Sequence, residues 1–251
     1  MTNIIKPESS ESNSIENSIP ANSRRSFLKW SSAAALTAFA FGALNPETLS
    51  AKAAFAGLPI DDEKSGVVDL GKGDFGVLNY AYALEQLEAA FYTQVIATPY
   101  AQMTSEERAI LTDIRDHEVA HREFFKAALG KKAIPGLSVN FTAINFNSRE
   151  SVLGTARTFE DTGVAAYNGA GQLLKNGTFL LIAGKIVSVE ARHAATIRDL
   201  LSPNSSAFSG DDVTDPRTGL DKALLPSQVL PLVAPFIKTP ITGSKLPKPK
   251  S

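Results

Sequence analysis

The chain has 251 residues, 43% of them hydrophobic and 20% charged, which is typical of one ordinary globular domain. Its 25 lysines and arginines nearly balance 26 aspartates and glutamates, so it lacks the positive field by which proteins hold nucleic acid. The absence of cysteine excludes disulfides, thiolate metal sites and thiol catalysis. Any chemistry must therefore use carboxylates, hydroxyls, amines or the three histidines.

The first part of the chain, residues 1–53, is predicted to be a disordered segment followed by an export signal. Residues 1–22 are rich in Ser, Asn and Glu and lack apolar periodicity, so they cannot bury enough surface to become ordered. Residues 23–29 read SRRSFLK and precede an uncharged apolar stretch, and Ala51-Lys52-Ala53 then forms a small-x-small cleavage pattern. About 14 apolar residues fall short of the roughly 20 that span a bilayer, so no lasting membrane span is expected.

This segment resembles a twin-arginine export signal. The residues that carry the resemblance are Arg24, Arg25, Phe27 and Leu28. It implies that the twin-arginine translocation machinery is a partner and that the chain is exported already folded. The mature protein is expected to start at Ala54, after cleavage behind Ala53, with cleavage behind Ala56 as the alternative. It would then act in the periplasm or elsewhere outside the cytoplasm, and a cofactor acquired before export would suit this route.

Four segments of similar length carry apolar residues at three- and four-residue spacing, which predicts four long helices. Their expected ranges are 74–97, 104–129, 148–174 and 178–201. Short connections join the first two and the last two, and a longer one joins the second to the third. We therefore expect an all-α four-helix bundle over residues 70–201 with a longer 2–3 crossover.

The remaining residues, 202–251, are rich in Gly, Pro and Asp and are expected to form a C-terminal extension. One apolar segment, residues 226–237, predicts a short helix that packs on the bundle. The last residues, KLPKPKS, are expected to form a disordered, solvated tail.

Two of the predicted helices place a glutamate on the apolar stripe with a histidine three residues later. These pairs are Glu118 with His121 and Glu190 with His193. Residues at this spacing share one helical face and lie about 5–6 Å apart, so both side chains of a pair can reach one metal site. His117 lies about 100° from Glu118 around the helix, so we expect it behind the ligands or at the surface.

The other two helices each place a glutamate on the stripe with a tyrosine seven residues later. Glu85 precedes Tyr92, and Glu160 precedes Tyr167, so the two halves of the chain look alike. The tyrosines are expected to hydrogen-bond the ligands, to act as nearby redox groups, or simply to pack. The shared tyrosine at plus seven favours Glu85 as the ligand of the first helix. Glu88, one turn further on, stays open as an alternate ligand or as an acceptor behind the ligands.

The sequence resembles the ferritin-like di-iron carboxylate superfamily, and within it the ferritin-like family that includes the desiccation-related proteins. The resemblance is carried by residues 84–92, LEQLEAAFY, and 189–195, VEARHAA. In that superfamily two helices each supply one Glu and the other two each supply Glu-x-x-His. The resemblance implies as metal ligands Glu85, Glu118, His121, Glu160, Glu190 and His193, with Glu118 and Glu190 bridging two ions.

Charge balance also favours a pair of divalent ions, because two ions carry +4 against four carboxylates at −4. Pairing of these carboxylates with Arg or Lys is the alternative, but the candidates mostly lie off the stripe. Oxygen-rich sites with one imidazole per ion suit Fe or Mn. We therefore expect a di-iron or di-manganese protein, an oxidoreductase if catalytic, that handles O2, peroxide or ferrous iron in stress protection. The alternative is a non-catalytic bundle, with structural metal or none, that has a protective or binding role. A homo-oligomer is compatible with either function.

Overall fold

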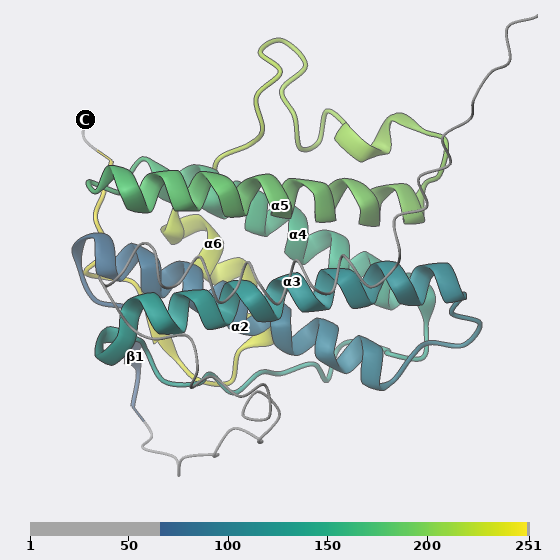
Figure 1. Cartoon of the computed structure of the whole chain (residues 1–251), viewed down its shortest axis with the longest axis horizontal. Helices are drawn as coiled ribbons and strands as arrows, with labels where there is room; N and C mark the ends of the chain where they lie inside the picture. The colour runs from purple at the N-terminus through teal and green to yellow at the C-terminus, as the bar shows by residue number, and fades with distance from the viewer. Residues whose placement is uncertain (1–65, 250–251) are drawn as a thin grey trace, which may run out of the picture. The chain divides into compact units, whose positions relative to one another are not determined.

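Four long helices dominate the computed structural model, which describes residues 66–249 (Figure 1). They are α2 (Gly73–Ala97), α3 (Ser105–Leu129), α4 (Arg149–Gly171) and α5 (Gly177–Leu201). The predicted all-α four-helix bundle is confirmed, with the long connection between α3 and α4. None of the helices in the described part of the chain is both long enough and apolar enough to cross a membrane. The predicted export signal lies outside the described residues.

Side-chain caps explain where the helices begin. Thr104 accepts a hydrogen bond from the Glu107 amide at 3.1 Å, and the Glu107 carboxylate accepts one from the Thr104 amide at 3.0 Å, so both ends of this capping box are satisfied. The Asn176 side chain accepts from the amides of Thr178 and Phe179 and so starts α5. The expected end of α4 near residue 174 is therefore about three residues too late, because the chain has to turn before this cap.

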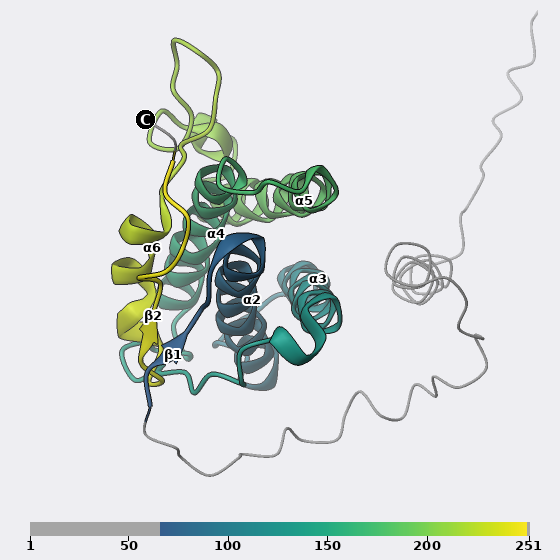
Figure 2. The same ribbon diagram turned by 90° about the vertical axis from the view of Figure 1, so that its left-hand side faces the viewer.

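The helices pack as two antiparallel pairs, α2 with α3 and α4 with α5, and α2 lies beside α4 in the middle (Figure 2). Figure 2 shows α6 (Pro226–Val233) and β2 (Ile241–Thr242) on one side of α2 and α4, and α3 and α5 on the other. This position explains why α2 is buried on nearly all of its faces.

The long crossover between α3 and α4 is held against α2 by two buried amide side chains. Asn79 donates to the carbonyl of Lys132 at 2.9 Å and accepts from the amide of Ile134 at 3.0 Å. Gln86 accepts from the amide of Leu137 at 2.8 Å. These bonds satisfy loop backbone groups that would otherwise be buried without partners.

The C-terminal extension returns along the bundle and pairs with the start of the described chain. Val68 in β1 (Val68–Asp69) is opposite Ile241 in β2, in parallel register. Leu246 is buried, although it lies in the segment expected to form a disordered, solvated tail. The apolar side chain of Leu246 fills space beside Gly76 and Gly243, which keeps the tail on the bundle.

Two glycines of α4 admit groups from elsewhere in the fold. A Cβ at Gly169 would lie 1.9 Å from the carbonyl oxygen of Leu224, so a side chain here would collide with the extension as it crosses the helix. A Cβ at Gly163 would lie 3.1 Å from an oxygen of Glu88. At these positions the absence of a side chain makes room for a backbone segment and for a carboxylate.

Candidate metal centre

All six predicted ligands lie together in the interior of the bundle, between the four long helices. Glu85 comes from α2, Glu118 and His121 from α3, Glu160 from α4, and Glu190 and His193 from α5. The four glutamates have no exposed surface, and His193 is 4% exposed. Isolated carboxylates are almost never buried to this extent, so this cluster needs a compensating positive charge.

The six side chains form two overlapping groups of four, each with ligand atoms within 4.8 Å of one another. The first group contains Glu85 and His121, and the second contains Glu160 and His193. Glu118 and Glu190 belong to both groups. The geometry therefore has two adjacent centres with two shared carboxylates, the arrangement expected for bridging ligands.

Each histidine turns Nδ1 toward carboxylates of both halves of the chain. Nδ1 of His193 lies 2.8 Å from Glu118 and 3.5 Å from Glu160. Nδ1 of His121 lies 2.9 Å from Glu190 and 3.4 Å from Glu85. The two halves are thus interleaved at the cluster, because each histidine makes its shortest contact with a glutamate of the other half.

Eight polar atoms that face the cluster are buried and have no hydrogen-bond partner among the described residues. They are one oxygen each of Glu85 and Glu160, both oxygens of Glu118 and Glu190, and Nδ1 of His121 and His193. Their close contacts lack hydrogen-bond geometry, and each such buried group would cost about 1–3 kcal/mol if left unpaired. Convergent, unpaired oxygen and imidazole donors are the donor set of a metal site, so the residues fit metal ions.

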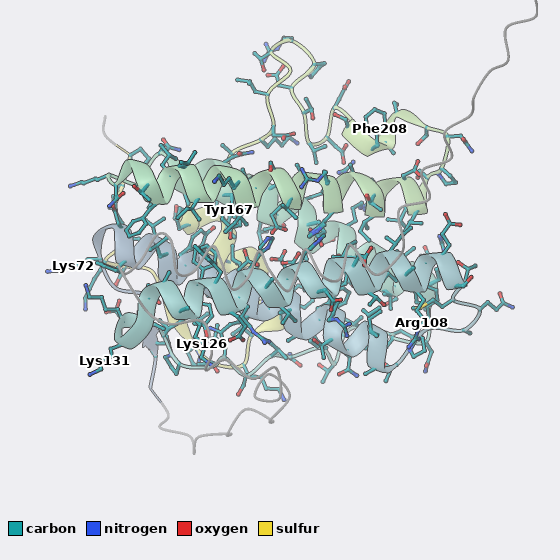
Figure 3. The ribbon with its side chains drawn as sticks, viewed as in Figure 1. Lys72, Arg108, Lys126, Lys131, Tyr167 and Phe208 are labelled. Carbon is teal, nitrogen blue, oxygen red and sulfur yellow. The ribbon has the colours of Figure 1, made fainter. Side chains whose placement is uncertain are left out.

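The remaining oxygens of Glu85 and Glu160 are held by tyrosines. Tyr92 donates to Oε1 of Glu160 at 2.5 Å, and Tyr167, buried within the bundle (Figure 3), donates to Oε1 of Glu85. Of the three roles left open for the tyrosines, the structure shows hydrogen bonding to the predicted ligands. Each hydroxyl orients a carboxylate so that its second oxygen faces the cluster.

Burial and mutual repulsion shift the acid–base behaviour of the cluster. Burial, with the nearby charge of Glu190, raises the pKa of Glu118 to about 8. Burial also raises the pKa of Glu160 to about 7. Burial opposes protonation of His193, but the facing carboxylates, Glu160 foremost, outweigh it and raise its pKa to about 12. Protons thus occupy the cluster in the metal-free protein, and metal ions would have to displace them.

Pairing of the cluster with Arg or Lys does not occur in the described part of the chain, where the ion pairs of these carboxylates involve histidines alone. Arg115 pairs instead with Asp116, and Arg122 with Glu123, both at the surface.

Glu88, the alternative in α2, lies close to the cluster but outside both groups. It is 3% exposed and lies against Gly163 of α4. Burial, followed by the charges of Glu118 and Glu190, raises its pKa well above the usual carboxyl value. The geometry therefore places Glu85, and not Glu88, among the converging side chains, and burial favours the neutral form of Glu88.

His117 contacts the cluster from outside, which agrees with its expected position behind the ligands. Its Nδ1 lies 2.9 Å from Nε2 of His193, and the two rings stack with an interplanar angle of 9°. His193 therefore has one nitrogen toward the carboxylates and the other toward His117. The specific contact was missed, although His117 and His121 are four residues apart and share a helical face.

Comparison with known proteins supports this description. The family model described as a ferritin-like domain matches residues 73–203, which spans all four helices and all six predicted ligands and covers about half of the chain. A search of the curated proteins finds no match. The chain therefore belongs to the ferritin-like domain family.

Proposed function

We propose that this protein binds two iron or manganese ions at the shared-carboxylate cluster and acts on O2, peroxide or ferrous iron in stress protection. The observation that carries the proposal is the convergence of eight unpaired buried atoms from six side chains. Four carboxylates and two neutral imidazoles balance two divalent ions. When bound, such a pair of ions supplies redox chemistry toward oxygen species.

The protein's own residues would prepare the site for these ions. Glu118 and Glu190 would be shared between them, while Glu85 with His121 and Glu160 with His193 would complete one side each. The tyrosine hydroxyls hold Glu85 and Glu160 in place, and the complete burial of the four glutamates keeps bulk water from the site. A dry site strengthens electrostatic interactions within it.

The first experiment measures bound metal in the mature protein after export, by elemental analysis. We expect about two Fe or Mn ions per chain, and their loss in the double variant Glu118→Gln/Glu190→Gln. The matched control is Glu123→Gln/Glu150→Gln, which changes two exposed glutamates of the same helix pairs and should retain the metal. A wild-type protein that folds stably and binds neither ion would refute the proposal.

A second measurement separates catalysis from a purely structural role. The metal-loaded protein is assayed for oxidation of ferrous iron by O2 and by peroxide. Turnover that is lost in the double variant supports the redox function. Metal that is required for folding, without any turnover, would favour the alternative of a metal-stabilised bundle with a protective role.

We propose further that the protein acts outside the cytoplasm after export by the twin-arginine machinery. The support is the motif at Arg24 and Arg25 and the apolar stretch that follows it. Replacing both arginines by lysine keeps the charge and should leave the precursor in the cytoplasm, whereas Lys6→Arg should not affect export. Normal export of the double-lysine variant would contradict this route.

A further inference from the structure

A second feature lies beside the metal centre: an apolar cavity with a free volume of about 40 Å³, lined by residues from all four long helices. Its inner wall includes Leu84, Phe125 and Tyr167, which are buried. Ala128 of α3 and Ala183 of α5 form part of its outer wall and reach the surface. The cavity therefore extends from the α3–α5 side of the bundle toward its interior.

The chemistry of the wall excludes well-ordered water. Among the lining side chains, polar atoms occur only in the hydroxyls of Tyr80 and Tyr167, and that of Tyr167 is already bonded to Glu85. A buried water usually needs two to four polar partners, so this cavity favours an apolar occupant.

The position of the cavity connects it with the centre. Leu84 precedes Glu85 in the chain, and Tyr167 both lines the cavity and holds Glu85 through its hydroxyl. A small molecule in the cavity thus touches residues that touch the predicted ligands. The larger groove between the extension and the outer side of α4 and α5 also borders neighbours of the predicted ligands, such as Asp161 and Ala191. Its lining includes the charged side chains of Arg198 and Asp212, so it is not an apolar site.

We propose that this cavity binds dioxygen and supplies it to the metal centre, an inference that rests on the proposed function. The free volume is about three times the 10–15 Å³ that one water requires, so a diatomic molecule fits. It is well below the roughly 150 Å³ of an apolar cavity that admits benzene. Peroxide is polar and would find few hydrogen-bond partners here, so the cavity distinguishes the two oxidants.

The first test uses xenon, an apolar atom of suitable size, with the metal-free protein. Crystals under xenon pressure, or xenon NMR in solution, should show one site lined by Leu84 and Tyr167. Two variants fill the cavity from opposite walls, Ala128→Phe from α3 and Ala183→Phe from α5. Each should lower xenon affinity by about tenfold or more. The matched control is Ala127→Phe, because Ala127 is also exposed on α3 but does not line the cavity.

The second test compares two oxidants on the protein loaded with ferrous iron. Two ferrous ions each lose one electron, and with two protons these reduce O2 to hydrogen peroxide, or hydrogen peroxide to two waters. The filling variants should slow oxidation by O2 by about tenfold relative to Ala127→Phe. They should leave oxidation by peroxide and the metal content unchanged.

Absence of xenon from the cavity would overturn the proposal, as would equal O2 rates in the filling and control variants with metal still bound. Displacement of xenon by a short alkanol would overturn the size argument and indicate a hydrocarbon occupant. Failure to bind metal would count against the proposed function alone, because xenon occupancy is measured on the metal-free chain.

Discussion

The hydroxyl of Tyr167 in α4 donates a hydrogen bond to Oε1 of Glu85 in α2, 82 positions earlier in the chain. The relationship is reciprocal, because Tyr92 of α2 donates to Glu160 of α4. Each half of the bundle thus orients a carboxylate of the other half. Both glutamates then present their second oxygen, which has no partner, to the cluster.

Replacing Tyr167 by Phe should weaken metal binding by about 10-fold to 100-fold, the usual effect of removing a group that orients a ligand. The cause is the loss of the donor to Glu85, with the ring and its packing retained. Metal titration of the purified variant measures the effect. Tyr82→Phe is the control. Tyr82, in α2, is buried like Tyr167 but lies outside the cluster. Equal affinity in both variants would show that this hydrogen bond does not prepare the site.

The two carboxylates of α2 should respond differently to replacement by Gln. Glu85→Gln should lower the metal content by about one ion per chain, because Glu85 belongs to one of the two groups. Glu88→Gln should keep the full content, since burial already favours the neutral form of Glu88. Elemental analysis of the two variants decides between them, and the opposite pattern would make Glu88 the ligand.

The stability of the metal-free protein should fall as the pH rises. The raised pKa values of Glu118, about 8, and Glu160, about 7, mean that the folded chain keeps protons which the unfolded chain releases near pH 4.5. This contribution is complete below pH 4.5 and is lost as the pH passes through 7 to 8. The raised pKa of His193 acts in the same direction above its ordinary value of 6.5.

Thermal unfolding measures this dependence. The midpoint of the metal-free protein should drop by about 5 °C between about pH 5.5 and 8.5. Bound metal should remove the drop, because metal ions replace the protons. The variant Glu118→Gln/Glu160→Gln should show a flatter profile without metal. A midpoint that rises over this range would contradict the assigned pKa directions.

Two glycines of α4 should respond oppositely to replacement by alanine. Gly169→Ala places a methyl group 1.9 Å from the Leu224 carbonyl and should destabilise the fold by about 2–4 kcal/mol as the extension is displaced. Gly154→Ala meets nothing within 4 Å and should stabilise by about 0.5–1 kcal/mol through helix propensity. Denaturant unfolding of both variants measures the difference. Equal effects would mean that the extension does not pack on α4 at Leu224.

Spacing along the chain predicted which side chains converge, because they are carried on helices. A residue three positions after another returns to the same helical face whatever the rest of the fold does. Glu118 and His121 therefore project from one face of their helix, and Glu190 and His193 do the same. The choice between Glu85 and Glu88 could not be made in this way. One turn separates them, and only the position of α4, with Gly163 opposite Glu88, distinguishes their surroundings.

The sequence by itself determined the four helices, the long crossover and the six side chains that meet, because helical periodicity and capping are local properties. Tertiary structure decided the exchange of tyrosines between halves, the contact of His117 with His193, and the return of Leu246 to the core. It also decided the apolar cavity beside Tyr167. These features join residues far apart in the chain, and their geometry depends on how whole helices pack, which no local pattern encodes.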